Sequence, residues 1–148
     1  MNDDAMHVLD LAMQGYQCSQ ILMKMALEAQ GKQNEELVRA MAGLAVGMGA
    51  GKACGALTGG CSVLGLYAGC GSTAEPPDDR LPEMLSEFVD WFESEFTPHY
   101  GGIECATIVQ DDMRNKMSRC PCIVMETLTR LKQILAEHGY AFEKSNRA

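Results

Sequence analysis

The chain has 148 residues, and its 12 lysines and arginines against 20 aspartates and glutamates give a formal net charge of −8. This charge argues against a nucleic-acid partner or an anionic membrane surface, since both attract basic proteins. Because 47% of the residues are apolar and a chain of this length buries roughly 70% of its unfolded surface, residues 1–148 are predicted to fold as one domain without disulfides or metals.

Helical periodicity dominates the N-terminal part of the chain. Residues 4–29 are predicted to form one helix, with Gly15 and Cys18 on its inward-facing stripe. A second helix is predicted over residues 34–47, because Asn34 is a good N-cap and two glutamates follow it in the first turn. Cys18 is therefore expected to face the protein interior.

The middle of the chain is unusually rich in glycine. Residues 47–55 contain too many glycines to continue a helix without cost, so we expect a break there and a third helix from about Cys54 to Leu66. Glycine also recurs at every fourth residue, at Gly43, Gly47, Gly51, Gly55 and Gly59. Wherever this stretch is helical, the repeat forms a ridge without side chains, along which another helix can approach closely.

Three more helices are predicted after a loop at residues 71–80. The first has Pro82 in its first turn and ends at Pro98, and a short helix near residues 103–113 follows it. After a charged connection over residues 111–119, the last helix begins at Cys120-Pro121 and ends near His138-Gly139. No alternation typical of a strand is present. The predicted fold class is all-α: a single-domain bundle of five to six helices with a glycine-rich central helix.

The expected compartment decides how the seven cysteines are interpreted. The sequence begins Met1-Asn2-Asp3-Asp4, which has neither the basic start nor the apolar run of a signal peptide, so we expect a cytoplasmic protein. In that reducing compartment, cysteines more often bind metals or carry out redox chemistry than form structural disulfides. The uncharged stretch 53–71 is not predicted to span a membrane, because its six glycines leave too little large apolar surface.

Three of the cysteines lie where a thiolate is favoured. No Cys-x-x-Cys is present, which excludes a thioredoxin-type dithiol and c-type haem attachment. Cys54, Cys105 and Cys120 each lie at the predicted start of a helix, where unpaired N–H groups and the positive end of the helix dipole stabilise a thiolate. Such positions suit a thiolate-bound metal or cluster, and equally a reactive thiol. Cys18, from a different helix, completes a four-cysteine site if its helix faces these three ends.

The order of these elements resembles the C_GCAxxG_C_C family, a group of small redox-active proteins defined by four cysteines. The resemblance covers residues 10–130, nearly the whole chain. It rests on Gly15-Tyr16-Gln17-Cys18-Ser19-Gln20, on Cys54-Gly55-Ala56-Leu57-Thr58-Gly59 after a glycine-rich turn, on the single Cys105, and on Cys120-Pro121. Each short motif is weak alone, and the specificity comes from all four in this order.

The resemblance implies a helical fold in which Cys18, Cys54, Cys105 and Cys120 share one site. A related domain occurs in split-Soret cytochromes, which are dimeric and carry a four-cysteine iron–sulfur site besides their haems. By this similarity we expect a homodimer whose four cysteines bind an iron–sulfur cluster of the [2Fe–2S] type, for electron transfer or redox sensing with a redox partner protein. The haem part does not carry over, because the chain has no haem-attachment motif.

Two other uses of the same cysteines are open alternatives. The first is thiol–disulfide or sulfur-transfer chemistry, with Cys54, Cys105 or Cys120 as a nucleophile of lowered pKa. The second is a structural zinc site of four cysteines in an interaction module, which would be colourless and redox-silent. All three uses need the same four side chains, so only the bound metal and its chemistry separate them.

Further residues lie close to these motifs in the sequence. Cys61 falls on nearly the same helix face as Cys54, whereas Cys70 is half a turn away from it, and both are typical of small buried side chains. Cys122 is a candidate competing ligand or resolving thiol. His99 is a candidate ligand or proton donor, although a loop histidine is more often solvated. Lys52 is a candidate counter-charge for anionic thiolates.

Overall fold

The computed structural model describes residues 3–144, which form seven α-helices. Within this range no strand occurs, and an isolated antiparallel bridge joins Ala53 to Glu104. The all-α class is confirmed, and residues 1–2 and 145–148 of the expected domain lie outside the described residues. In chain order the helices are α1 (Asp3–Met13), α2 (Cys18–Ala29), α3 (Glu35–Met41), α4 (Gly55–Ala68), α5 (Arg80–Tyr100), α6 (Cys105–Val109) and α7 (Lys116–Glu137).

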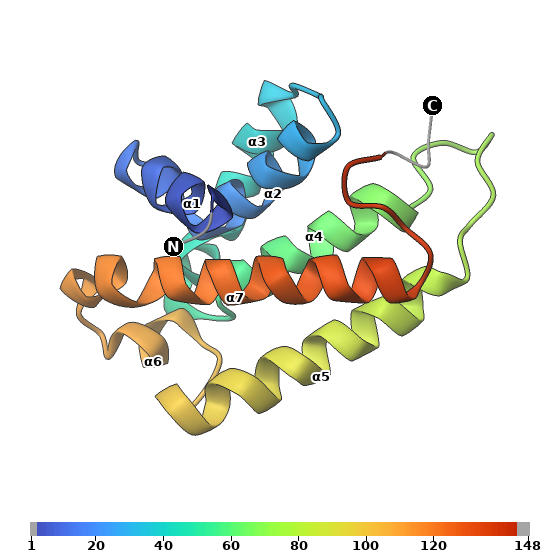
Figure 1. The fold of residues 1–148 in the computed structure, drawn as a ribbon. Coiled ribbons are helices and arrows are strands. Elements are labelled where there is room, and N and C mark those ends of the chain that lie inside the picture. The colour runs from blue at the N-terminus through green and yellow to red at the C-terminus, as the bar shows by residue number, and fades with distance from the viewer. Residues whose placement is uncertain (1–2, 145–148) are drawn as a thin grey trace.

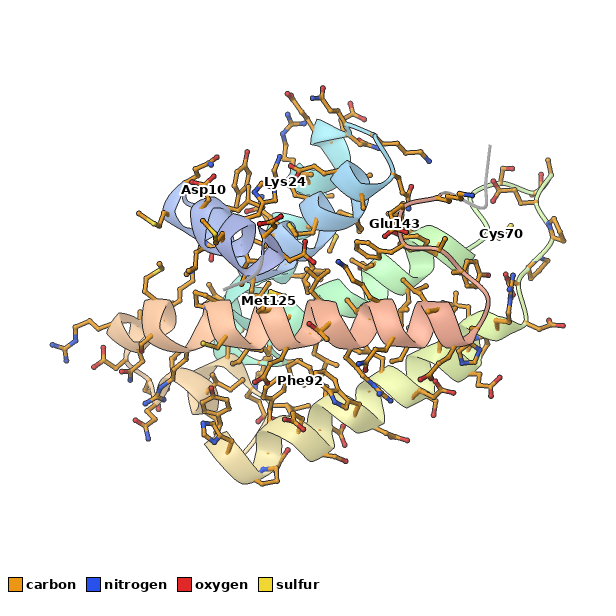
Figure 2. All side chains as sticks on the ribbon, in the orientation of Figure 1. Asp10, Lys24, Cys70, Phe92, Met125 and Glu143 are labelled. Atoms are coloured by element: carbon orange, nitrogen blue, oxygen red, sulfur yellow. The ribbon has the colours of Figure 1, made fainter. Side chains whose placement is uncertain are left out.

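Helix α4 is the central helix of the bundle, as the glycine-rich composition predicts. It carries no charged residue, and nine of its 14 residues are buried, because α2, α5 and α7 all pack against it. Figure 1 shows α7 crossing in front of α4, with α5 on one side of α7 and α1–α3 on the other. Phe92 of α5 is fully buried and lies between α5 and α7 (Figure 2).

Close helix contacts on both faces of α4 depend on glycine. A Cβ atom at Gly59 of α4 would lie 2.8 Å from the Cα atom of Ser19, and one at Gly60 would lie 2.3 Å from the ring of Phe88. The side chain of Ser19 is fully buried, and its hydroxyl donates to the carbonyl oxygen of Met41 at 2.8 Å. Glycine therefore sets the spacing of α4 from α2 on one face and from α5 on the other.

The predicted single helix over residues 4–29 is wrong, because the chain turns between Met13 and Cys18. Gly15 has a φ of +100°, which lies outside the helical region and favours glycine. The new helix is started by Gln20, whose side-chain oxygen accepts the backbone N–H of Gln17 at 3.0 Å. The break adds a seventh helix to the five or six predicted, and it places Cys18 at a helix start.

The second predicted helix ends earlier than its periodicity indicates. Instead of continuing to residue 47, α3 ends at Met41, and a short 3-10 turn follows at Ala42–Leu44. Residues 46–49 then all have positive φ, including Val46 at +55° and Met48 at +60°. Gly43 of the glycine repeat therefore lies in the 3-10 turn, and Gly47 and Gly51 have left-handed backbone conformations, so only Gly55 and Gly59 belong to the helical ridge.

The predicted ends of the two long C-terminal helices also need correction. Helix α5 continues past Pro98 to Tyr100, and it ends where Gly101 adopts a φ of +90°. Helix α7 starts at Lys116, within the segment predicted as a connection. Cys120 is therefore its fifth residue, and the predicted helix-start position for Cys120 is wrong. The loop at 71–80, the start of α4 and the end of α7 agree with prediction to within two residues.

No helix in the described part of the chain is both long and apolar enough to cross a bilayer.

Candidate functional site

Four cysteines from four different helices line one small cavity. Cys18 is the first residue of α2, Cys54 is the N-cap of α4, Cys105 is the first residue of α6, and Cys120 lies in the second turn of α7. The structure therefore brings together the four side chains that the sequence singled out. The full lining is Gln17, Cys18, Val46, Cys54, Gly55, Cys105, Ile108, Val109, Met113, Lys116 and Cys120.

Backbone pairing fixes two of these cysteines next to each other. The backbone N–H of Cys54 donates to the carbonyl of Ile103 at 2.9 Å, and the N–H of Cys105 donates to the carbonyl of Lys52 at 2.7 Å. These bonds flank the bridge between Ala53 and Glu104. The starts of α4 and α6 are thus joined as a short antiparallel pair, which the sequence did not predict because only one residue on each side is in the bridge.

A glycine makes room for the third thiol. A Cβ atom at Gly55 would lie 2.6 Å from the Sγ atom of Cys18, and 3.3 Å from the carbonyl oxygen of Leu44. Sulfur cannot approach a methyl group that closely. The glycine that follows Cys54 in the sequence motif is therefore a requirement for placing Cys18 in the cavity.

The pKa values of the four thiols differ from those expected of cysteines at helix starts. A hydrogen bond from Cys54 lowers the pKa of Cys18 to about 7 in spite of its burial. The same bond and burial raise the pKa of Cys54 well above its usual value. Burial together with the charge of Cys18 raises the pKa of Cys105, and burial with the charges of Cys18 and Cys105 raises the pKa of Cys120 to about 12.

The expectation of lowered pKa values for Cys54, Cys105 and Cys120 is therefore wrong. Burial in a poorly solvated cavity disfavours the charged form of each further thiol, and repulsion from the first thiolate adds to this effect, so the two together outweigh the helix dipoles. The cavity can hold one thiolate by itself. A second or third requires positive charge from elsewhere.

Lys116 supplies positive charge at the cavity and was missed in the sequence. It lines the cavity, and its charge acts to lower the pKa values of Cys18, Cys105 and Cys120. Its ammonium group donates to the side-chain oxygen of Gln17, which ties α7 to the start of α2. The available signal was the spacing of four residues to Cys120, which puts both side chains on one face of a helix. Lys52 is exposed and does not line the cavity.

A wider, mostly apolar groove adjoins the cysteine cavity. It has a volume of about 180 Å3, and it shares Gln17, Cys18, Lys116 and Cys120 with the cavity. Ile21, Pro121 and Val124 supply apolar surface to it. Cys18 and Cys120 are therefore the two cysteines nearest to this groove, and Cys54 is the most enclosed of the four.

The three other cysteines lie elsewhere. Cys61 is half-buried on α4, and burial alone raises its pKa. Cys70 is exposed in the loop after α4, far from α6 in Figure 2, and its thiol donates to the carbonyl of Ser72 at 2.8 Å. Cys122 faces a separate cavity of about 590 Å3 between α5 and α7, which His99 also lines. Neither Cys122 nor His99 lines the four-cysteine cavity.

The four sulfur atoms are spread more widely than one metal ion requires. Nowhere in residues 3–144 do three cysteine sulfurs all lie within 4.8 Å of one another. In a tetrahedral zinc site of four thiolates, Zn–S bonds of about 2.3 Å put all four sulfurs about 3.8 Å apart. A single zinc ion would therefore require the thiol side chains to move closer together.

The four thiols are suitable ligands for an iron–sulfur cluster, but the small free volume between them requires their side chains to change conformation. The cavity between the thiols measures about 10 Å3, close to the smallest space that holds one water molecule. A cluster would therefore occupy the volume into which the thiols now point, so their side chains must rotate to bind it. Four converging thiols, an adjacent cation and apolar walls are the environment that such clusters require.

Comparisons with known proteins agree with this constellation. A family model described as "putative redox-active protein (C_GCAxxG_C_C)" matches residues 16–134. The match spans all seven helices except α1 and the end of α7, and it includes the four cysteines of the cavity. Neither the curated proteins nor the solved structures gave a match.

Proposed function

The chain belongs to the C_GCAxxG_C_C family of redox-active proteins, and on this basis we propose that Cys18, Cys54, Cys105 and Cys120 bind an iron–sulfur cluster of the [2Fe–2S] type for electron transfer or redox sensing. The observation that carries the proposal is the convergence of four thiols from four helices on one cavity. A family with redox activity and a site made of thiols point to the same chemistry.

The charge balance of the cavity gives a physical reason for binding a cationic centre. Burial and mutual repulsion keep Cys54, Cys105 and Cys120 protonated, while Cys18 ionises near neutral pH. Iron ions bound by the sulfurs would remove this repulsion and release the remaining protons. When bound, the cluster supplies a one-electron redox centre, and the protein sets its potential through nearby charges, N–H donors and solvent exclusion.

Electrons would leave the site through the α1–α2 and α7 side. Cys18 and Cys120 line both the cavity and the adjoining groove, so a redox partner protein docked on the groove would lie closest to these two ligands. The homodimer remains an expectation from the family resemblance, and light scattering of the purified protein tests it. All seven cysteines are free thiols in the structure, which suits the reducing cytoplasm that we propose as the compartment.

The test of the proposal is anaerobic purification followed by iron, zinc and acid-labile sulfide analysis and a visible spectrum. The expected result is about two irons and two sulfides per chain, with absorption in the visible region. Colourless protein with one zinc per chain would replace the cluster with the structural zinc site. Absence of bound metal after chemical reconstitution would leave the thiols themselves as the redox groups.

Lys116 is expected to tune the potential of the cluster. Reduction adds a negative charge, which the adjacent ammonium group stabilises, so Lys116→Gln should lower the midpoint potential. For an interaction of about 1 kcal/mol the shift is roughly 40 mV. Optical redox titration measures it. Lys52→Gln, which removes an exposed charge outside the cavity, should leave the potential unchanged. An equal shift in both variants would mean that only the net charge of the protein matters.

A hydrogen bond between two thiols favours a second function for the metal-free protein. The thiol of Cys54 donates to Cys18, which pairs a thiolate with a neighbouring thiol. Oxidation of this pair by an external disulfide would form a Cys18–Cys54 bond and transfer two electrons and two protons to the oxidant. In this function Cys18 is the nucleophile, in place of the three cysteines that the sequence favoured.

Alkylation of the metal-free protein at different pH values tests the thiol pair. Because the pKa of Cys18 is lowered to about 7, its thiolate is present above pH 7 and falls about tenfold for each pH unit below. Peptide mapping by mass spectrometry should therefore show a midpoint near pH 7 for Cys18, while Cys120, with a pKa of about 12, stays largely unmodified. Cys54→Ala removes the donor and should move the midpoint upward. An unchanged midpoint in that variant would contradict the pairing.

A further inference from the structure

A second group of metal-ligating side chains lies at the opposite end of α7 from the cysteine cavity. Glu83 and Glu87 are one turn apart on α5, and His138 is the C-cap of α7. One ligand atom from each lies within 4.8 Å of the other two, and no other three His, Cys, Asp or Glu side chains in the described chain meet this condition. His138 follows Cys120 by 18 residues, or about 27 Å along a helix, so the two groups are separate.

The spacing within this group already approaches that of ligands around one ion. The Nε2 atom of His138 lies 3.1 and 3.2 Å from the two carboxylate oxygens of Glu87. In a tetrahedral zinc site, bonds of about 2.0–2.2 Å place neighbouring ligand atoms about 3.3–3.6 Å apart. The side chain of His138 is only 13% exposed, so its position is fixed by packing. Glu83 is exposed and needs only a small movement to complete the group.

The charges around the group favour a cation. With a neutral imidazole, two carboxylates give a net charge of −2, and neither glutamate has an ion pair with a lysine or arginine in the described residues. A neighbouring arginine, Arg80, is paired with Asp78 at 2.8 Å and donates to the carbonyl oxygen of His138 at 2.8 Å. Arg80 therefore holds the end of α7 in place without neutralising the glutamates.

We propose that Glu83, Glu87 and His138 form a binding site for a divalent first-row metal ion, with Zn2+ as the best match. Imidazole and carboxylate are ligands that zinc accepts, and three protein ligands leave a fourth position for water. The ion replaces the hydrogen bond between His138 and Glu87 with two metal bonds and adds Glu83. It joins the first turns of α5 to the end of α7, and it stabilises the helix pair from the end remote from the cysteines.

The experiment must distinguish this site from zinc bound to cysteine. The chain has three histidines, His7, His99 and His138, so NMR of the imidazole groups during titration with Zn2+ reports on His138 directly. We expect the His138 signals to shift and to saturate when one zinc ion is bound to the Glu83, Glu87 and His138 group, while the His99 signals do not shift. His7, which pairs with the single carboxylate of Glu28 at 2.5 Å, is an internal control for a histidine beside one glutamate.

Variants complete the test. Glu83→Gln and Glu87→Gln should each weaken the response of His138 to zinc about tenfold or more, whereas Glu93→Gln, an exposed glutamate on the same helix outside the group, should not. Circular dichroism without zinc shows whether each variant is folded, and in protein whose thiols have been blocked by alkylation zinc should raise the melting temperature of the parent and of Glu93→Gln only. An unchanged His138 response in Glu83→Gln, or equal shifts of all three histidines, would overturn the proposal. The outcome does not depend on whether the cysteines bind a cluster.

Discussion

Replacing Cys18, Cys54, Cys105 or Cys120 with serine, one at a time, is expected to reduce bound iron and sulfide by about tenfold or more in each variant. Serine keeps the size of the side chain but is a poor iron ligand, because its hydroxyl stays protonated near neutral pH. Each substitution leaves a cavity with three thiols, which cannot complete the ligand set. Metal analysis and the visible spectrum of anaerobically purified protein measure the loss.

The other cysteines provide matched controls for this result. Cys61→Ser, Cys70→Ser and Cys122→Ser change a thiol in the same way but outside the cavity, so iron and sulfide should stay at the parent level. Cys122 is the most informative control, because it is only two residues from Cys120 and faces a different cavity. Loss of the cluster in Cys122→Ser with retention in Cys120→Ser would show that Cys122 is the ligand.

The sequence identified the cysteines that meet, but partly for the wrong physical reason. The predicted position at a helix start is confirmed for Cys54 and Cys105 and is wrong for Cys120, which lies in the second turn of α7. Cys18, which was predicted to lie within a helix, is instead the first residue of α2. Local patterns indicated the residue types and the motif order, whereas the pKa values depend on how many thiols share one cavity, which only the tertiary arrangement decides.

Two contributions to the site depend on where helices begin and on how separate segments meet, which local patterns indicate only weakly. Lys116 reads as one charge in a polar connection, and it becomes part of the site because α7 begins four residues earlier than predicted. The bridge between Ala53 and Glu104 joins segments 51 residues apart through one residue on each side, too short to produce a strand pattern. The break at Gly15 within the predicted first helix likewise depends on a positive φ, which composition alone does not reveal.

Gly55→Ala is expected to destabilise the protein and to displace Cys18 from the site. The new Cβ atom would lie 2.6 Å from the Sγ atom of Cys18 and 3.4 Å from the Cα atom of Ala45. Since Gly55 does not have a positive φ, alanine fits the backbone, and the effect comes from the clash alone. Overpacking of this kind lowers the free energy of unfolding by about 1–3 kcal/mol. Urea denaturation of the metal-free protein measures it, and iron content after reconstitution should fall in parallel.

Gly65→Ala is the matched control, because it lies on the same helix and its added Cβ atom would meet no other atom within 4 Å. In the interior of α4 alanine removes backbone entropy from the unfolded chain, so this variant should be more stable by roughly 0.5–1 kcal/mol and should keep its cluster. Both variants add one methyl group to α4, and only the methyl group at residue 55 would clash with the thiol of Cys18. If Gly55→Ala retained both parental stability and parental iron content, the close approach of Cys18 to α4 would not be a requirement for the site.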